Sequence, residues 1–308
     1  MFHGLKCVAT ALLFLAACAS DDRKVQEKIK WDAASFKEYW YAGSGELSRY
    51  HLKQARYGEV HEGDAVLIFV TEDFLRDRQV KRDFGNDPAD SVLKLNARRD
   101  FNTGLYNYSL MTSVFTKVDF EKPQTSKITF SGQDWCGQVF AQMNHQENQY
   151  FTRLFSYFQS EGDQTFNLPE ALLEDEIWTR IRIAPHRLPT GALQVIPSFQ
   201  FARLRHRKMG PYQADATLEK RKDRTFSDES VLVYELTYRD LERTLSIFFE
   251  KTAPFSILGW REVYPSGFGE NPQNLVTTAV RTHRMMTDYW NKHGRKDRKL
   301  RKELGLEP

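Results

Sequence analysis

The fold class is decided by the stretch Val231-Leu232-Val233-Tyr234-Glu235-Leu236-Thr237-Tyr238. Large apolar or aromatic residues occupy every second position, and the positions between them include Glu235 and Thr237. A period of two residues is typical of a β-strand, in which successive side chains point to opposite faces. Because one face carries polar residues, the stretch predicts an antiparallel sheet with that face partly in water.

The same period recurs on both sides of this stretch. Strands are predicted after it at 244–250, and before it at 193–207 and 212–222. The first half of the chain predicts further strands at 46–57, 65–70, 92–98, 105–115, 127–131, 135–143 and 150–159. A sheet of more than about ten strands tends to curl or close. We therefore predict a mainly β fold, either a strongly curved antiparallel sheet or a partly open β-barrel in two halves.

Three helices are predicted around these strands. Pro169, followed by apolar residues at helical spacing, predicts a crossover helix over about 169–182 between the two halves. Asp32 is placed to cap a short helix over 33–41. The apolar spacing from Leu275 to Trp290 predicts a third helix, which a basic tail follows.

These elements predict four parts along the chain. They are a signal peptide (1–17), a polar tether (18–30), a single β-rich domain (31–270) with halves at about 31–163 and 185–270, and a C-terminal helix with a basic tail (271–308).

The N-terminal segment has the pattern of a secretory signal peptide. Lys6 precedes an apolar run from Val8 to Ala17, which is too short for a stable membrane-spanning helix of about 20 residues. Leu15-Ala16-Ala17-Cys18 resembles the lipobox of bacterial lipoproteins, in which the cysteine is acylated and becomes the mature N-terminus. The resemblance implies anchoring to a membrane through acylated Cys18, since two or three acyl chains bind stably.

The residues after Cys18 bear on sorting. Ala19 stands where an aspartate would resemble a signal for retention at the inner membrane, so the resemblance implies the outer membrane. Ala19-Ser20-Asp21-Asp22 also resembles the short acidic signals that carry some lipoproteins to the cell surface. The alternative is that Asp21 and Asp22 only solvate a linker, so the periplasmic and the cell-surface face both stay open.

Composition excludes several classes of protein. Hydrophobic residues make up 41% and aromatic residues 13%, which is enough for a sizeable core. Lys and Arg number 44 against 41 Asp and Glu, so the net charge of +3 gives no reason to expect nucleic acid. With Cys7 in the signal and Cys18 acylated, only Cys136 of the three cysteines remains, which excludes an intrachain disulfide. The histidines show no metal-ligand spacing, and no cofactor is predicted.

Catalytic candidates are weak. Cys136 would need a nearby base, and His145 lies nine residues further along the same predicted hairpin; a free cysteine on a strand is more often a small buried hydrophobe. Asp73, or Glu161 with Asp163, would serve acid–base chemistry only if folding paired it with another carboxylate.

Two sets of residues are candidates for binding. Arg203, Arg205 and Arg207 would form a basic patch with 220–224 if both segments were paired strands, or else simply the wet face of a hairpin. The second set mixes aromatic and polar side chains that either line the mouth of a cavity or pack beneath a tight turn: Asn102, Tyr106, Tyr108 and Trp135.

Several stretches resemble a group of uncharacterised bacterial lipoproteins that often carry the label of a septum-formation inhibitor of the Maf type. The residues that carry the resemblance include Ala55-Arg56-Tyr57-Gly58-Glu59, 66–74 (VLIFVTEDF), Phe101-Asn102-Thr103-Gly104 and Asp134-Trp135-Cys136-Gly137. True Maf proteins resemble nucleotide pyrophosphatases of α/β fold, which this sequence does not match. The resemblance therefore implies a lipoprotein, and it implies no particular activity.

The sequence favours a lipid-anchored envelope protein without enzymatic activity, which binds or carries a hydrophobic or amphipathic ligand. One alternative is a structural or assembly partner of another envelope protein, and a second is a hydrolase that uses Cys136 or a carboxylate pair. The ligand and the oligomeric state are not predicted.

Overall fold

The computed structural model describes residue 22, residues 24–267 and residues 272–306. Over these residues the fold is mainly β, as predicted, and fifteen strands form one sheet. The strands are β1 (Gly45–Arg56), β2 (Glu59–Leu75), β3 (Ala89–Thr103), β4 (Tyr106–Lys117), β5 (Thr125–Asp134), β6 (Gly137–Gln146), β7 (Gln149–Ser156), β8 (Gln164–Pro169), β9 (Leu172–Leu173), β10 (Gly191–Ile196), β11 (Tyr212–Lys222), β12 (Ser230–Tyr238), β13 (Arg243–Phe249), β14 (Ile257–Ser266) and β15 (Gln273–Thr287). The α-helices with labels are α2 (Ala33–Trp40), α3 (Glu174–Ile183), α4 (Phe199–Arg205) and α5 (Lys299–Glu303).

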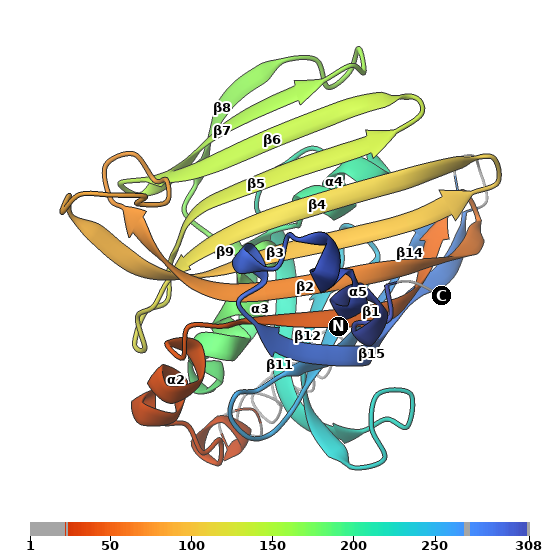
Figure 1. Cartoon of the computed structure of the whole chain (residues 1–308). Helices are drawn as coiled ribbons and strands as arrows, with labels where there is room; N and C mark the ends of the chain where they lie inside the picture. Colours follow the sequence, from red (N-terminus) through yellow and green to blue (C-terminus); the bar gives the residue numbers. More distant parts are fainter. Residues whose placement is uncertain (1–21, 23, 268–271, 307–308) are drawn as a thin grey trace, which may run out of the picture.

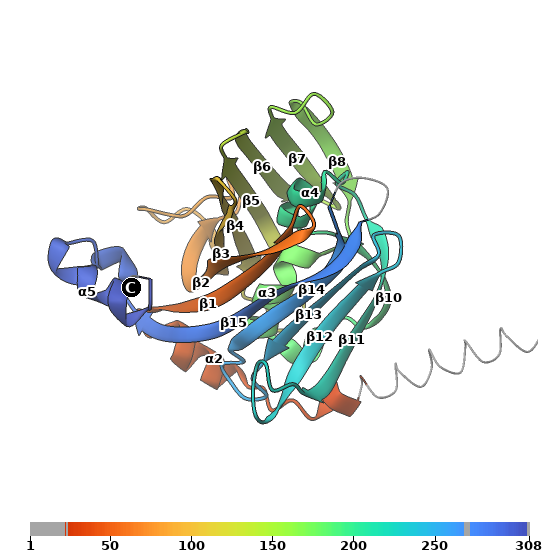
Figure 2. The same ribbon diagram turned by 90° about the vertical axis from the view of Figure 1, so that its right-hand side faces the viewer.

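The sheet consists of two meanders. Strands β1 to β8 follow one another in space, and so do β9 to β15, with β1 and β15 paired antiparallel where the two runs meet. The sheet bends around α3 and α4, which lie inside the curve (Figures 1 and 2). Its outermost strands, β8 and β9, do not pair with each other, so the sheet is not closed into a barrel.

Helix α3 is a crossover, as predicted. It connects β9 to β10, which pair in parallel through Val195 with Leu172 and Ile196 with Leu173. A parallel pair needs such a crossover, because a tight hairpin turn returns the chain antiparallel. The other pairs of neighbouring strands in the described sheet are antiparallel.

The stretch that decided the fold class becomes β12, with its two faces in different surroundings. The face with Leu232, Tyr234, Leu236 and Tyr238 belongs to the main core inside the curve. On the outer face, Val231 and Val233 pack in a small second cluster beneath Phe226 and Phe248. The outer face of β12 is therefore drier than its polar residues predict, because the loop before the strand folds Phe226 over it.

Three consecutive acids at the start of α3 connect it to the sheet and to α4. Glu174 accepts hydrogen bonds from β12 and β13, Asp175 accepts the N–H of Phe199 at 3.2 Å, and Glu176 accepts the N–H of Thr125 at 3.3 Å. All three are buried. Carboxylates are favourable at a helix N-terminus because the backbone N–H groups there are unpaired.

Three predicted elements are wrong in type or extent. The helix predicted over 275–290 is strand β15, and its Thr-rich sequence of alternating burial outweighs the apolar spacing. The strand predicted over 193–207 ends at Ile196, because Pro197 interrupts it and Ser198 caps α4 by accepting the N–H of Phe201. The helix predicted over 169–182 begins only at Glu174, since 164–169 form the edge strand β8. By contrast, the helix predicted after Asp32 is confirmed as α2.

The predicted tether also behaves differently where it is described. Asp22 is buried and accepts the N–H of Leu218 in β11 at 3.0 Å. Val25 and Ile29 pack against the core, and the Gln26 amide donates to the carbonyl of Leu188 at 2.6 Å. Over Asp22 and residues 24–30 the prediction of a free spacer is therefore wrong. Cys18, Ala19, Ser20 and Asp21 lie outside the described residues.

Candidate functional site

A cavity of about 850 Å³ lies between the inner face of β5–β8 and the segment of α4; we call it the side cavity. Its walls are mainly apolar, and its rim is polar where the β7–β8 turn faces the end of α4. The apolar lining includes Phe130, Val139, Leu154, Phe166, Phe199 and Met209. Pockets that hold small ligands commonly have volumes of about 300–1,000 Å³ and apolar walls with a few polar groups.

The inner wall of the side cavity follows from strand alternation. Phe130 in β5 lies opposite Ala141 in β6, and Leu154 in β7 lies opposite that same Ala141. Side chains at directly paired positions share a face of the sheet. Phe130, Val139 and Leu154, which line the cavity, therefore all lie on the face of the sheet that is turned toward α4.

Helix α4 is fixed over the side cavity by polar contacts at its C-terminal end. Arg203 donates to Asp134 at 3.0 Å, and both side chains are almost fully buried. The carbonyl of Leu204 accepts a hydrogen bond from Arg56. His206 ends the helix in the left-handed conformation, with φ of 49°. This turn directs the chain out of the helix, and the next two residues, Arg207 and Lys208, line the rim of the cavity.

Across the rim, His206 lies 2.5 Å from Glu161 in the turn between β7 and β8. Glu161 also accepts a hydrogen bond from Ser156 at 3.2 Å. The contact joins α4 to the edge of the first meander. It therefore places both walls of the side cavity relative to each other.

A network of buried charges fills the curve beside the side cavity; we call it the interior network. Arg243 in β13 donates to Glu174 at 2.5 and 2.8 Å and to Glu262 at 3.1 Å. Arg99 in β3 pairs with Glu262 at 2.9 Å. Two arginines thus balance two glutamates, which leaves Asp175 as the surplus acid beside them.

Burial raises the pKa of Asp175 to about 7, and the adjacent Glu174 carboxylate acts in the same direction. The ordinary pKa is 3.8, so the folded state binds this proton more tightly than the unfolded state. Between about pH 4 and pH 7 the carboxyl is therefore protonated in the folded state and ionised in the unfolded state. The contribution of Asp175 to stability is complete below about pH 4 and is lost as the pH rises through about 7. We expect Asp175→Asn to raise the free energy of unfolding at pH 8 and to leave it nearly unchanged at pH 4.

Urea unfolding of both proteins across this pH range checks the prediction. An Asp215→Asn variant, which changes a partly exposed carboxylate of β11, serves as the control. A gain from Asp175→Asn that is as large at pH 4 as at pH 8 would contradict the raised pKa.

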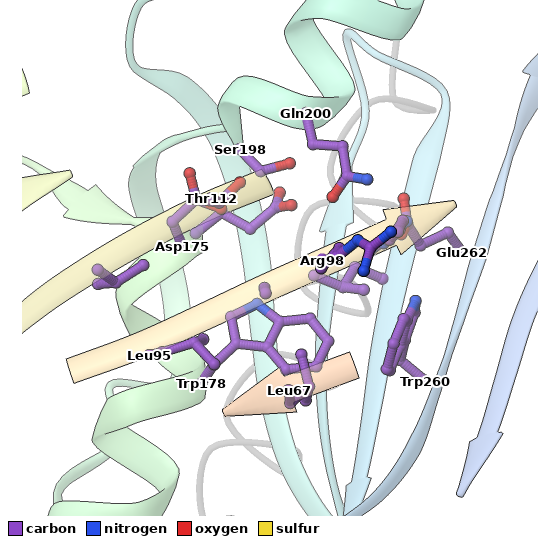
Figure 3. Close-up of a pocket in the computed structure, with 15 residues that line it drawn as sticks. Leu67, Leu95, Arg98, Thr112, Asp175, Trp178, Ser198, Gln200, Trp260 and Glu262 are labelled. Carbon is purple, nitrogen blue, oxygen red and sulfur yellow. The ribbon is translucent and has the colours of Figure 1, made fainter. Parts of the chain in front are cut away.

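A small chamber of about 20 Å³ lies within the interior network (Figure 3). Figure 3 shows side chains from α3, from the start of α4 and from β14 facing it. Three of its lining atoms are buried without a hydrogen-bond partner among the described residues, namely Thr112 Oγ1, Gln200 Nε2 and Trp260 Nε1. The volume suits one water molecule, which could bond to these groups. A chamber of this size does not admit an organic substrate, so the carboxylates around it are not placed for hydrolase chemistry.

The structure brings three of the four predicted aromatic and polar candidates together. The hydroxyl of Tyr57 lies 2.9 Å from that of Tyr106 and 2.6 Å from that of Tyr108. Trp135 stacks on Tyr106 with ring centroids 6.4 Å apart. Asn102 is exposed between two buried residues of β3 and therefore faces the other side of the sheet. The side cavity is lined by none of the four candidates among the described residues, but Asn102 and Tyr108 both line a separate hollow of about 450 Å³.

The predicted basic patch is also wrong in its arrangement. Arg203 and Arg205 lie on a helix rather than on a strand, and Arg205 donates to the carbonyl of Gly267 at 3.2 Å. Arg221 of the second basic segment pairs with two glutamates of β11 and β12. Of the predicted arginines, Arg203 and Arg207 line the side cavity instead.

Cys136 is exposed in the turn between β5 and β6, so its interpretation as a buried hydrophobe is wrong. His145 lies near the opposite end of β6. At about 3.3 Å per strand residue, the two side chains cannot meet. Asp73 pairs with Arg82, and neither the Glu161 nor the Asp73 contact joins two carboxylates.

Within the part of the chain that the structure describes, no group of three His, Cys, Asp or Glu residues is placed to hold a metal ion. None of the described helices is both long and apolar enough to cross a bilayer.

Comparison with known proteins assigns no family to this chain. No model of a protein family matches the sequence, and no curated protein matches it. Among solved structures, the chain is similar to a β-barrel-like protein from Brucella abortus that belongs to a domain of unknown function, DUF1849. The TM-score is 0.47 and the identity 9%, over 79% of this chain and 98% of that one. This similarity concerns the backbone and carries nothing about function.

Proposed function

We propose that this protein is a binding or carrier module that holds a hydrophobic or amphipathic ligand in the side cavity. The observation that carries the proposal is the cavity itself, with about 850 Å³ of space against the inner face of β5–β8. Among the described residues, the chamber in the network measures only about 20 Å³, and two shallower hollows measure about 440 and 450 Å³. The side cavity therefore offers more space for an organic ligand than these other hollows.

The proposal includes the place in the cell. The lipobox ending at Cys18 supports a lipid-anchored protein of the outer membrane. Asp22 is bonded to β11, so the sorting role proposed for the acidic pair is best tested on Asp21. A change of Asp22 would also alter a contact of the folded domain.

Filling the side cavity is expected to abolish ligand binding. Ala202→Trp on α4 and Leu154→Trp on β7 each add a large side chain to one of the two facing walls. For the chain without residues 1–18, we expect uptake of a neutral hydrophobic dye to fall at least tenfold in either variant. Fluorescence titration measures the uptake, and lipid extraction followed by mass spectrometry measures any co-purified ligand.

The matched control is Ala192→Trp, which places the same side chain at an exposed position of β10 outside the cavity lining. It should leave dye uptake unchanged. Unfolding curves show whether each variant is folded. Failure of the unmodified chain to take up dye or to carry lipid would overturn the proposal.

A second candidate function is that of an assembly partner, favoured by exposed apolar residues on the outer face of the first meander. Phe140 and Phe155 are paired across β6 and β7 and are 37% and 47% exposed, and Met111 of β4 is 38% exposed. Exposed apolar patches often mark sites of protein contact. Crosslinking in cells from Phe140 would recover a protein neighbour if this surface is used.

A further inference from the structure

The charged groups around the rim of the side cavity are unequally neutralised. Arg203 is paired with Asp134, and His206 with Glu161. Arg207 and Lys208 are exposed, and no carboxylate of the described residues forms an ion pair with either. Two cationic side chains of the rim are thus available to a ligand.

On the opposite side of the rim lie two carboxylates, Glu161 and Asp163. Glu161 is engaged by His206 and by the Ser156 hydroxyl. Asp163 is the one further carboxylate among the described residues that line the cavity. Both carboxylates belong to the turn between β7 and β8, whereas Arg207 and Lys208 follow α4, so the α4 side of the rim is where a negatively charged group would bind.

The apolar wall and the cationic rim lie on the same cavity. Leu154 and Phe166 extend the apolar surface of β7 and β8 beneath the rim, and Met209 follows directly after the two cations. A ligand that filled this space would place an apolar part against the sheet and a polar end at the rim. Arginine and lysine together suit a carboxylate or a phosphate.

We propose that the ligand of the side cavity is an anionic amphiphile, whose carboxylate or phosphate head group binds Arg207 and Lys208 while its apolar part lies along β5–β8. This inference rests on the proposed function, which it makes more specific. It also gives a role to Arg207, whereas the similarly basic residues Lys222 and Arg224 have none in the cavity.

The test uses the full chain with Cys18→Ser, which removes the acylation site, and a neutral naphthylamine dye as reporter. Four competitors with the same alkyl chain displace the dye: dodecanoate, dodecyl phosphate, dodecanol and dodecylammonium. We expect the two anions to displace the dye at lower concentrations than dodecylammonium. A comparison of dodecanoate with dodecyl phosphate distinguishes the two head groups.

The variant Arg207→Glu with Lys208→Glu reverses both charges of the rim. We expect it to weaken displacement of the dye by the two anions about tenfold, since each exposed charge contact contributes modestly. Displacement by dodecylammonium should become stronger. The control, Lys222→Glu with Arg224→Glu, makes the same change of charge away from the cavity and should shift neither. Dye binding with equal displacement by anions and cations, unchanged by the reversal, would overturn the inference but leave the proposed function standing. Absence of dye binding to the Cys18→Ser chain with Arg207 and Lys208 unchanged would overturn both the inference and the proposed function.

Discussion

Arg243→Met is expected to lower the free energy of unfolding by about 3–5 kcal/mol, because it leaves two buried glutamates without their shared partner. The Arg243 side chain is 1% exposed, and the side chains of Glu174 and Glu262, which it joins, are 2% and 6% exposed. The ring of Phe201 packs against the guanidinium at 4.3 Å, so no water replaces the lost partner easily. Loss of one member of a buried ion pair costs far more than the pair contributes as a whole.

The control is Arg239→Met, a few residues earlier on the same hairpin. Arg239 pairs with Asp215 at 2.9 Å but is 73% exposed, and such surface pairs contribute about 0–1 kcal/mol. Urea unfolding of the two variants gives the comparison. If Arg243→Met destabilised the protein no more than Arg239→Met, the interior network would not hold the fold together.

Arg182→Met is expected to have a similar effect, again about 3–5 kcal/mol, through a separate ion pair. Arg182 in α3 donates two hydrogen bonds to Glu46 in β1, each of 2.7 Å, and both side chains are fully buried. The guanidinium also lies over the rings of Trp40 and Phe69. The pair joins the crossover helix to the strand at which the two meanders meet.

A double variant separates the loss of the ion pair from the cost of leaving the Glu46 charge buried without a partner. Glu46→Gln with Arg182→Met removes the stranded charge, so we expect it to be less destabilised than the sum of the two single variants. Burial raises the pKa of Glu46, but the Arg182 charge outweighs burial and the net pKa is lowered from 4.5. The stability that this pair contributes is therefore present above about pH 4.5 and is lost as the pH falls further. Additive effects of the two single changes would show that the side chains act independently.

The sequence predicts the fold class because strand periodicity is a local property. Alternation at 231–238 or 135–143 reports that one face is buried, whatever covers it. The errors occur where two local signals compete. In 275–290, helical spacing of a few apolar residues competed with β-branched threonines, and pairing with β1 and β14 decided in favour of the strand.

The side cavity was predictable only in part. The notion of a ligand in the curve of the sheet follows from aromatic residues on both halves, but the residues that line the cavity come from β5–β8 and α4 together. The cap at Ser198 after Pro197 is a local signal that would have predicted α4 and hence the helical position of Arg203. The partners of Arg203 and His206, Asp134 and Glu161, lie 69 and 45 residues away, and no local pattern shows such pairings.

The interior network was not predictable from the sequence. Charged residues at period-two positions, such as Arg99 and Arg243, predict a wet face of a strand. In the fold they point into the curve, where Arg243 pairs with Glu174 of α3 and Arg99 pairs with Glu262 of β14. Buried charges are stable only when paired, and the pairing exists only after both meanders and the crossover helix are in place.

The most direct test of the side cavity as the ligand site is photocrosslinking of the purified chain with a long-chain alcohol that carries a diazirine, followed by peptide mapping. Adjacent residues give an internal control on each of two strands. Val139 on β6 and Leu154 on β7 face the cavity, whereas the next residues, Phe140 and Phe155, face outward. We predict labels at Val139, Leu154 and Met209, and their loss in Ala202→Trp. Labels confined to Phe140 and Phe155, and unaffected by Ala202→Trp, would contradict the account.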